Sequence, residues 1–143
     1  MVTIIKLIVR YAETDQMGIV HHSNYPVWYE AARTEFTKSI GMSYSEFEKM
    51  GIILPLIGME SKFIRPAFYE DEIEVEVKLV RLTQVKMDFA YRVFRVGEDK
   101  PINTGKTFHG IVGKDMKPIM LKRAQPERYG KLLENCESEF GDE

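Results

Sequence analysis

The sequence has 143 residues, 44% of them hydrophobic, which suits one domain with a core of its own. Twenty basic and 22 acidic residues give a net charge of −2, so nucleic acid is not the expected partner. Cys136 is the only cysteine, which excludes an intrachain disulfide framework and fits a reducing compartment. The N-terminal apolar run is too short for a signal peptide or a membrane span. We therefore expect a single cytoplasmic domain over residues 1–143.

The first predicted element is a strand over residues 3–10. Its apolar side chains fall on both faces: Ile5, Leu7 and Val9 on one, Ile4 and Ile8 on the other. Strands with this pattern are usually covered on both sides, so we expect burial of both faces.

The main helix is predicted over residues 25–40, where the apolar spacing becomes helical. Its core stripe is Trp28, Ala32, Phe36 and Ile40. Asn24 is the expected cap, and Gly41 fits the position just past the helix end. A capping-box pattern at Ser43 predicts a second, short helix that ends near Gly51.

The remaining elements are mostly strands. They are expected at residues 52–64, 72–79, 86–96 and 104–112, followed by a short helix over residues 125–135. Pro55 favours a bend or an edge, and a change of phase at Phe94 suggests a bulge. The whole is an α+β domain in which a helix packs on an antiparallel sheet.

The turn between the first strand and the main helix carries the clearest candidate chemistry. Asp15 lies a few residues before the helix start, where unpaired backbone N–H groups can stabilise a negatively charged oxygen. A carboxylate in that place can act on a carbonyl group as a nucleophile or as a base. The same pattern also suits an Asx turn or a solvated loop, so both interpretations stay open at this point.

Other chemistries are less well supported by the residues. Asp15, His21 and His22 cluster, but adjacent histidines seldom bind one ion well and no HExxH spacing exists, so no metal is expected. His109 is interpreted as a packed strand residue. The sequence has no Gly-x-Ser-x-Gly elbow and no P-loop, which argues against serine hydrolases and nucleotide hydrolases.

Two stretches have a distinctive order of residues. The first contains Tyr11, Asp15, Gly18, Ile19, Val20, His22, Asn24, Tyr25 and Trp28, and the second runs from Phe63 to Ala67 and on to Tyr69, Glu70 and Asp71. Together they resemble the signature of hot-dog-fold acyl-CoA thioesterases of the 4-hydroxybenzoyl-CoA thioesterase-like group. The resemblance extends over about the first 115 residues, which makes it more specific than a single short motif.

The resemblance implies a fold, a reaction and an assembly. The fold is the hot-dog, an antiparallel sheet curled around one long central helix. The reaction is hydrolysis of an acyl-CoA, or an acyl carrier protein thioester, to a carboxylic acid and the free thiol, with no cofactor. Because sites in the family lie between two subunits, a homodimer or homotetramer is implied.

The resemblance also assigns roles to residues. Asp15 becomes the nucleophile or the general base, and the N–H of His22 polarises the thioester carbonyl while its imidazole orients water or the leaving thiolate. Tyr11 could hold the Asp15 loop through its hydroxyl group. The expected substrate contacts are Tyr25, Trp28, Leu54 and Leu56 on the acyl side and Lys62 and Arg65 on the coenzyme A phosphates.

Two alternatives from other functional classes remain. A hot-dog hydratase or dehydratase would use a histidine with a carboxylate, and hydration of an enoyl-CoA would reveal it. A non-catalytic acyl-CoA binding module would keep the pocket without turnover, and the presence of Asp15 argues against it.

Overall fold

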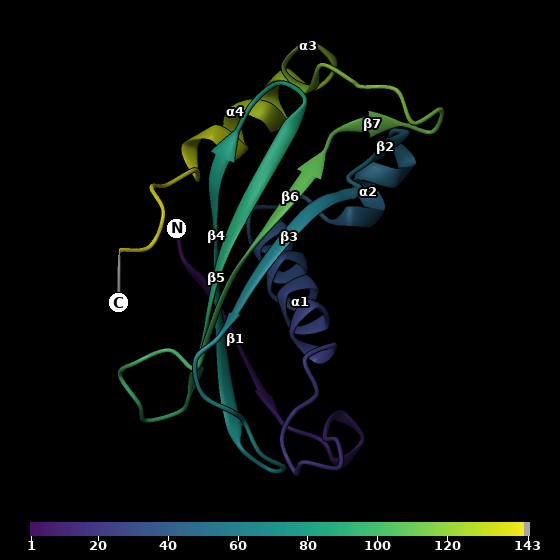
Figure 1. Cartoon of the computed structure of the whole chain (residues 1–143). Helices are drawn as coiled ribbons and strands as arrows, with labels where there is room; N and C mark the ends of the chain where they lie inside the picture. The colour runs from purple at the N-terminus through teal and green to yellow at the C-terminus, as the bar shows by residue number, and fades with distance from the viewer. Residues whose placement is uncertain (142–143) are drawn as a thin grey trace.

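The computed structural model describes residues 1–141. Its centre is a five-stranded antiparallel sheet in the order β1-β4-β5-β6-β3, with the long helix α1 (Asn24–Ser39) along one face (Figure 1). The strands are β1 (Thr3–Ile8), β3 (Leu56–Phe63), β4 (Glu72–Leu82), β5 (Lys86–Arg95) and β6 (Asn103–Gly110). A separate pair joins β2 (Ile52–Ile53) to β7 (Val112–Gly113).

Shorter helices complete the chain. They are η1 (Tyr11–Glu13), α2 (Tyr44–Lys49), α3 (Leu121–Ala124) and α4 (Pro126–Glu134). No helix within residues 1–141 combines the length and the apolar character needed to cross a membrane.

Helix α1 contacts the sheet from one edge to the other. It packs on β1 and β4, its Phe36 meets Phe89 of β5 edge-on at 5.7 Å, and its Tyr29 stacks on Tyr91 of β5 at 4.3 Å. The Tyr29 hydroxyl also reaches Ser61 of β3 at 2.9 Å. A helix that touches both edge strands is one around which the sheet curls, so the predicted hot-dog fold is confirmed.

The predicted core stripe of the helix is also confirmed. Trp28, Ala32, Phe36 and Ile40 are all buried. Gly105 of β6 faces Tyr29, and a side chain at this position would overlap the tyrosine ring. A glycine is therefore required where the helix approaches the sheet most closely.

Most element predictions agree with the structure to within a few residues. The main helix ends before Gly41, whose φ of +77° suits glycine, and the short helix α2 begins after Ser43. Pro55 separates β2 from β3 as expected. The short helix α3 was not predicted, because a four-residue element is too short to show a helical period.

The predicted bulge at Phe94 is wrong. Phe94 pairs with Glu74 in an uninterrupted register, and the irregularity between these strands lies at Leu79 and Arg81 instead. Phe94 lies on the outer face of the sheet near the Arg92 guanidinium, 5.4 Å from its ring centre. An apolar residue on an outer face changed the phase of the pattern without changing the pairing.

The expectation that both faces of the first strand are buried is also not met. Ile4 and Ile8 point outward and are 49% and 59% exposed. Part of the outer face is covered by the C-terminal segment. In this segment the backbone of Cys136 forms an isolated β-bridge with Leu79, and the Phe140 ring lies 4.1 Å from the Lys78 ammonium. This cover does not reach the Ile4 and Ile8 side chains.

Candidate active site

The turn that carries Asp15 is a small closed loop. Thr14 and Val20 form a bridge across its base, Asp15 N donates to Ile19 O at 3.0 Å, and Gly18 N donates to Asp15 O at 2.9 Å. Gly18 has a φ of +79°, which a residue with a side chain adopts only with strain. The loop is therefore held by its own backbone.

The Asp15 carboxylate has two differently placed oxygens. One oxygen, Oδ1, accepts the Met17 N–H at 2.8 Å, which is the Asx turn considered above. The other oxygen has no hydrogen-bond partner within residues 1–141. The structural role and the chemical role are thus compatible, because the turn orients the group and leaves one oxygen available.

Helix α1 begins at Asn24, directly after this loop. Asn24 is the first helical residue and not the cap, contrary to expectation, and Ser23 precedes it without a side-chain capping bond. The Asn24 amide instead donates to Glu13 O at 2.9 Å and to His21 O at 3.1 Å. Its side chain is engaged in tying the helix start to the loop, so it cannot fold back over the helix N-terminus.

The backbone donors at the helix start are mostly occupied. Asn24 N donates to His21 O at 3.0 Å, Tyr25 N donates to His22 O at 3.3 Å, and Pro26 has no N–H. The N–H of His22 has no acceptor among the described residues. Among the backbone groups of residues 21–26 it is therefore the donor that can still bind the oxygen of a substrate.

The two histidines have different surroundings. The His21 Nδ1 lies 2.8 Å from Ser23 Oγ and accepts the Ser23 N–H at 3.2 Å. The His21 ring is therefore hydrogen-bonded to the residue that precedes α1. The His22 ring is exposed and lies edge-on to Phe63 of β3, with 6.5 Å between ring centres. Across residues 1–141, no three His, Cys, Asp or Glu side chains come close enough to hold an ion.

Tyr11 lies at the other end of the loop. Its ring is 75% exposed and stands edge-on to Tyr69, 5.6 Å away, and its hydroxyl makes no hydrogen bond to residues 1–141. Its carbonyl oxygen accepts the Thr14 hydroxyl at 2.7 Å. In this chain Tyr11 supports the loop through its backbone, and its phenol faces solvent.

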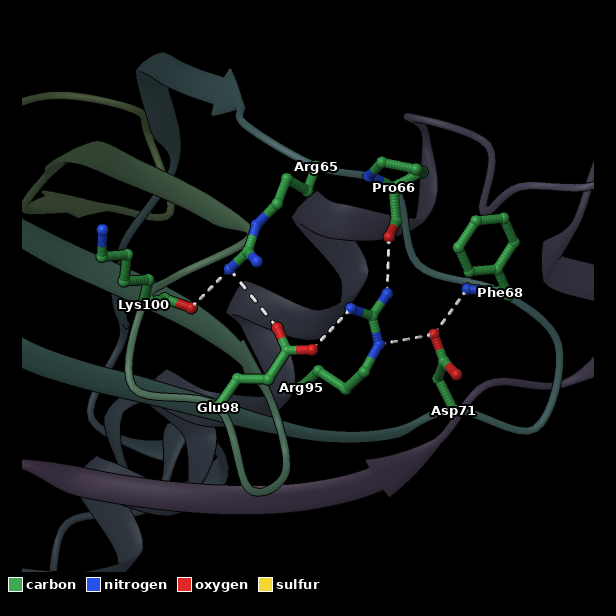
Figure 2. A network of polar contacts seen from close by, with 7 residues as sticks. All are labelled: Arg65, Pro66, Phe68, Asp71, Arg95, Glu98 and Lys100. Carbon is green, nitrogen blue, oxygen red and sulfur yellow. Dashed lines mark hydrogen bonds and ion pairs between the residues drawn. The ribbon is translucent and has the colours of Figure 1, made fainter.

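A polar network supports the loop from the side of residues 64–71 (Figure 2). Arg95 donates to Pro66 O at 2.7 Å and to the Asp71 carboxylate at 3.1 Å, and Asp71 also accepts the Phe68 N–H. The neighbouring carbonyl of Ala67 accepts Val20 N at 2.9 Å. Arg95 thus fixes the segment on which the Asp15 loop rests.

Arg65 belongs to the same network in this structure. Its guanidinium donates to Lys100 O at 2.9 Å and lies 3.4 Å from the Glu98 carboxylate. Figure 2 shows it turned toward these groups. To meet a phosphate, as predicted from the resemblance, Arg65 would have to exchange Glu98 for that ligand.

The other predicted substrate residues do not all lie near Asp15. Tyr25 and Trp28 are buried beneath the helix start. Lys62 projects from the outer face of β3, since its neighbour Ser61 points inward to Tyr29. Leu54 and Leu56 lie at the end of β3 that is opposite to Phe63. Seven residues of strand lead from Leu56 to Phe63, which corresponds to about 23 Å.

Leu54 belongs instead to a polar chain that crosses the inside of the sheet. Its carbonyl can only accept, so the His109 Nδ1 donates to it at 3.3 Å and the His109 Nε2 accepts the Thr107 hydroxyl at 2.9 Å. The chain continues to Tyr91 and Arg33. Burial, helped by the Arg33 charge, lowers the pKa of His109 to about 4, so the ring is neutral, in agreement with its prediction as a packed residue.

Two residues of the site were not foreseen. Phe63 begins the second stretch of the resemblance but had no role assigned to it. It contacts both His22 and Tyr25, from which about forty residues separate it, so no local pattern indicates these contacts. Glu13 is buried at 5% exposure and accepts the Trp28 indole N–H at 2.9 Å. The available signal was weak: a buried tryptophan needs an acceptor, but several acidic residues could have supplied it.

Comparison with known proteins identifies the family. Residues 9–126, which include every residue of the loop and of the supporting network, match the thioesterase-like superfamily. The chain belongs to this superfamily. The YneP protein of Bacillus subtilis (strain 168), named as a candidate acyl-CoA thioesterase, is 33% identical over 83% of this chain and 86% of its own length.

Two solved structures are also similar to this chain. A DHNA-CoA thioesterase from Staphylococcus aureus is 30% identical, covers 93% of this chain and 89% of its own, and superposes with a TM-score of 0.88. A hypothetical protein, TT1821 from Thermus thermophilus, is 33% identical over 96% of this chain and all of its own, with a TM-score of 0.86. The protein is an enzyme that hydrolyses thioesters.

Proposed function

We propose that the protein hydrolyses acyl-CoA thioesters at the Asp15 loop. The observation that carries this proposal is the pairing of an open carboxylate oxygen on Asp15 with the unoccupied N–H of His22 at the start of α1. One group delivers the nucleophile, and the other stabilises the charge on the carbonyl oxygen. Acyl-CoA is also the substrate class in the names of several relatives.

In the proposed reaction the Asp15 carboxylate acts directly on the carbonyl carbon or removes a proton from attacking water. The negative charge that develops on the carbonyl oxygen is bound by the His22 N–H, and the positive end of the α1 dipole adds to this binding. The tetrahedral species then breaks its C–S bond and releases coenzyme A as a thiolate. After attack by water the other product is the carboxylic acid, and Asp15 returns its proton to solvent. After direct attack the other product is a mixed anhydride on Asp15, which water hydrolyses to the acid and the free Asp15 carboxylate. The exposed His22 imidazole is placed to orient water or to protonate that leaving group.

We further propose that the working unit is at least a homodimer. Within the sheet, β3 is an edge strand, and it carries exposed apolar side chains: Leu56, Ile57, Met59 and Phe63. Exposed edges of this kind favour pairing with another chain. A partner paired antiparallel along β3 would bring its Leu54 and Leu56 toward the Phe63 end of the first chain, where His22 lies.

The cellular location is part of the same proposal. A single free cysteine, Cys136, suits the reducing cytoplasm, where acyl-CoA substrates would be available.

The function is tested by a hydrolysis screen. A panel of acyl-CoA thioesters with short, long and aromatic acyl groups would be incubated with the protein, and the released thiol would be measured. An acyl carrier protein thioester in the same panel distinguishes the carrier, and an enoyl-CoA tests hydration. We expect thiol release from at least one acyl-CoA and no hydration; hydration without thiol release would overturn the proposal.

A further inference from the structure

Glu13 stands two residues before Asp15 and has every polar atom engaged. Its carboxylate oxygens accept the Arg10 N–H at 2.8 Å and the Trp28 indole N–H at 2.9 Å. Its carbonyl oxygen accepts His21 N at 2.8 Å and the Asn24 amide at 2.9 Å. One residue therefore joins both limbs of the Asp15 loop to the first turns of α1.

We infer that Glu13 is a positioning residue for thioester hydrolysis, which holds the Asp15 turn and the His22 N–H in one fixed arrangement. The inference rests on the proposed function of Asp15. Glu13 itself does not face the substrate, because its side chain is buried behind the loop against Trp28. Its effect on the reaction is therefore exerted through the loop.

The chemistry of the site requires a carboxylate at this position. Both oxygens of the Glu13 carboxylate accept hydrogen bonds from N–H donors. In a glutamine, an NH2 group would replace one of these oxygens and face an N–H donor that it cannot accept from. Burial raises the pKa of Glu13, but the Arg10 N–H, the Trp28 N–H and the Arg10 charge together hold it below its usual value. A buried charge is retained here because it is paired on both oxygens.

The connection from Glu13 to the reacting groups is short. Thr14 alone separates Glu13 from Asp15, and the Thr14 N–H is fixed on Tyr11 O at 3.1 Å. On the opposite limb, His21 N is bound to Glu13 O, and the next residue is His22. A displacement of Glu13 therefore moves both the carboxylate and the oxyanion donor, which affects the chemical step more than substrate binding.

The test replaces Glu13 with glutamine. We expect Glu13→Gln to lower kcat by about 10- to 100-fold and leave KM within about threefold, because a misplaced reacting group costs rate. Exchange of the amide hydrogens in residues 14–21 should become about 10-fold faster. Glu35→Gln, a change of the same kind at an exposed position on α1, should alter none of these quantities.

Trp28→Phe removes the other partner of the same contact, the indole N–H that donates to Glu13, and keeps an aromatic ring against Tyr25. It should lower kcat less than Glu13→Gln, and the double variant should resemble Glu13→Gln alone, since both changes remove one interaction. If Glu13→Gln does not fold, Trp28→Phe and the exchange measurement still test the inference.

The two possible failures are distinguishable. A parent protein that hydrolyses none of the thioesters overturns the proposed function. A Glu13→Gln variant with unchanged kcat and unchanged amide exchange in residues 14–21 overturns the positioning role, whatever its thermal stability.

Discussion

At the scale of single residues, the site depends on which polar atoms remain unpaired. Among residues 1–141, Asp15 has one oxygen in an Asx turn and one without a partner, and the His22 N–H has no acceptor while the donors next to it are occupied. The sequence placed both residues in one loop but could not show which of their atoms were available. Such availability depends on the tertiary contacts of Glu13, Asn24 and Ser23.

The two functions of His22 can be separated by mutation. His22→Ala keeps the backbone N–H and removes the imidazole, so oxyanion binding should survive while the orientation of water is lost. We expect kcat to fall by about 10-fold or more, a loss below the full range of general acid–base catalysis because the thiolate is a good leaving group.

The kcat of His22→Ala would be compared with that of Gln16→Ala, which removes an exposed side chain from the same turn and should have little effect. A His22→Ala variant as fast as the parent would exclude the imidazole from the mechanism and leave the backbone N–H as the contribution of this residue.

His109 predicts a pH dependence of stability. Its pKa is about 4 in the folded protein and 6.5 normally, so the unfolded chain binds more protons between these values. The free energy of unfolding should therefore decrease as the pH falls below about 6.5, by about 2 kcal/mol between pH 7.5 and pH 5 from this residue. Urea unfolding of the parent and of His109→Gln at the two pH values measures it. An equal decrease in both proteins would contradict the prediction.

At the scale of elements, the hydrophobic periodicity of the sequence predicted the main helix and the central strands. The α1 stripe and the strand β4, expected at residues 72–79, were foreseen because their side chains sort between core and solvent at a regular spacing. The bulge at Phe94 and the burial of Ile4 and Ile8 were wrong, because both rest on what covers an outer face. The link between Glu13 and Trp28 was not visible, since it forms only when the loop folds onto the helix.

The loop over residues 64–71 is an element whose order depends on Arg95 (Figure 2). Arg95→Met removes the donors to Pro66 and Asp71 and should lower the free energy of unfolding by about 1–2 kcal/mol. The matched control is Arg81→Met, which removes an exposed arginine 3.9 Å from Asp88 and should cost no more than about 0.5 kcal/mol. Equal costs in chemical denaturation would show that the Arg95 network has no special role.

At the scale of the whole molecule, β1 and β3 are the two edge strands of the sheet, and within residues 1–141 the outer edge of β3 is not paired with another strand. We predict a homo-oligomer at micromolar concentration, and light scattering measures it. Met59→Glu puts a charge on that edge and should give a 16.6 kDa monomer with little activity, whereas Ile8→Glu on the outer face of β1 should still form at least a dimer. A parent protein that is monomeric and fully active would contradict the proposal that two chains complete the site.

The central claim is that Asp15 delivers the nucleophile, and the most direct measurement is the kcat of Asp15→Asn on the acyl-CoA that the parent hydrolyses fastest. The amide can still accept the Met17 N–H, so the turn is preserved, but it can neither attack nor accept a proton. Asp115→Asn is the matched control, because Asp115 makes the same turn contact to Lys117 N at 3.0 Å in an exposed loop. We predict a loss of about 100-fold or more for Asp15→Asn and none for Asp115→Asn. An Asp15→Asn variant within a few-fold of the parent would contradict the account.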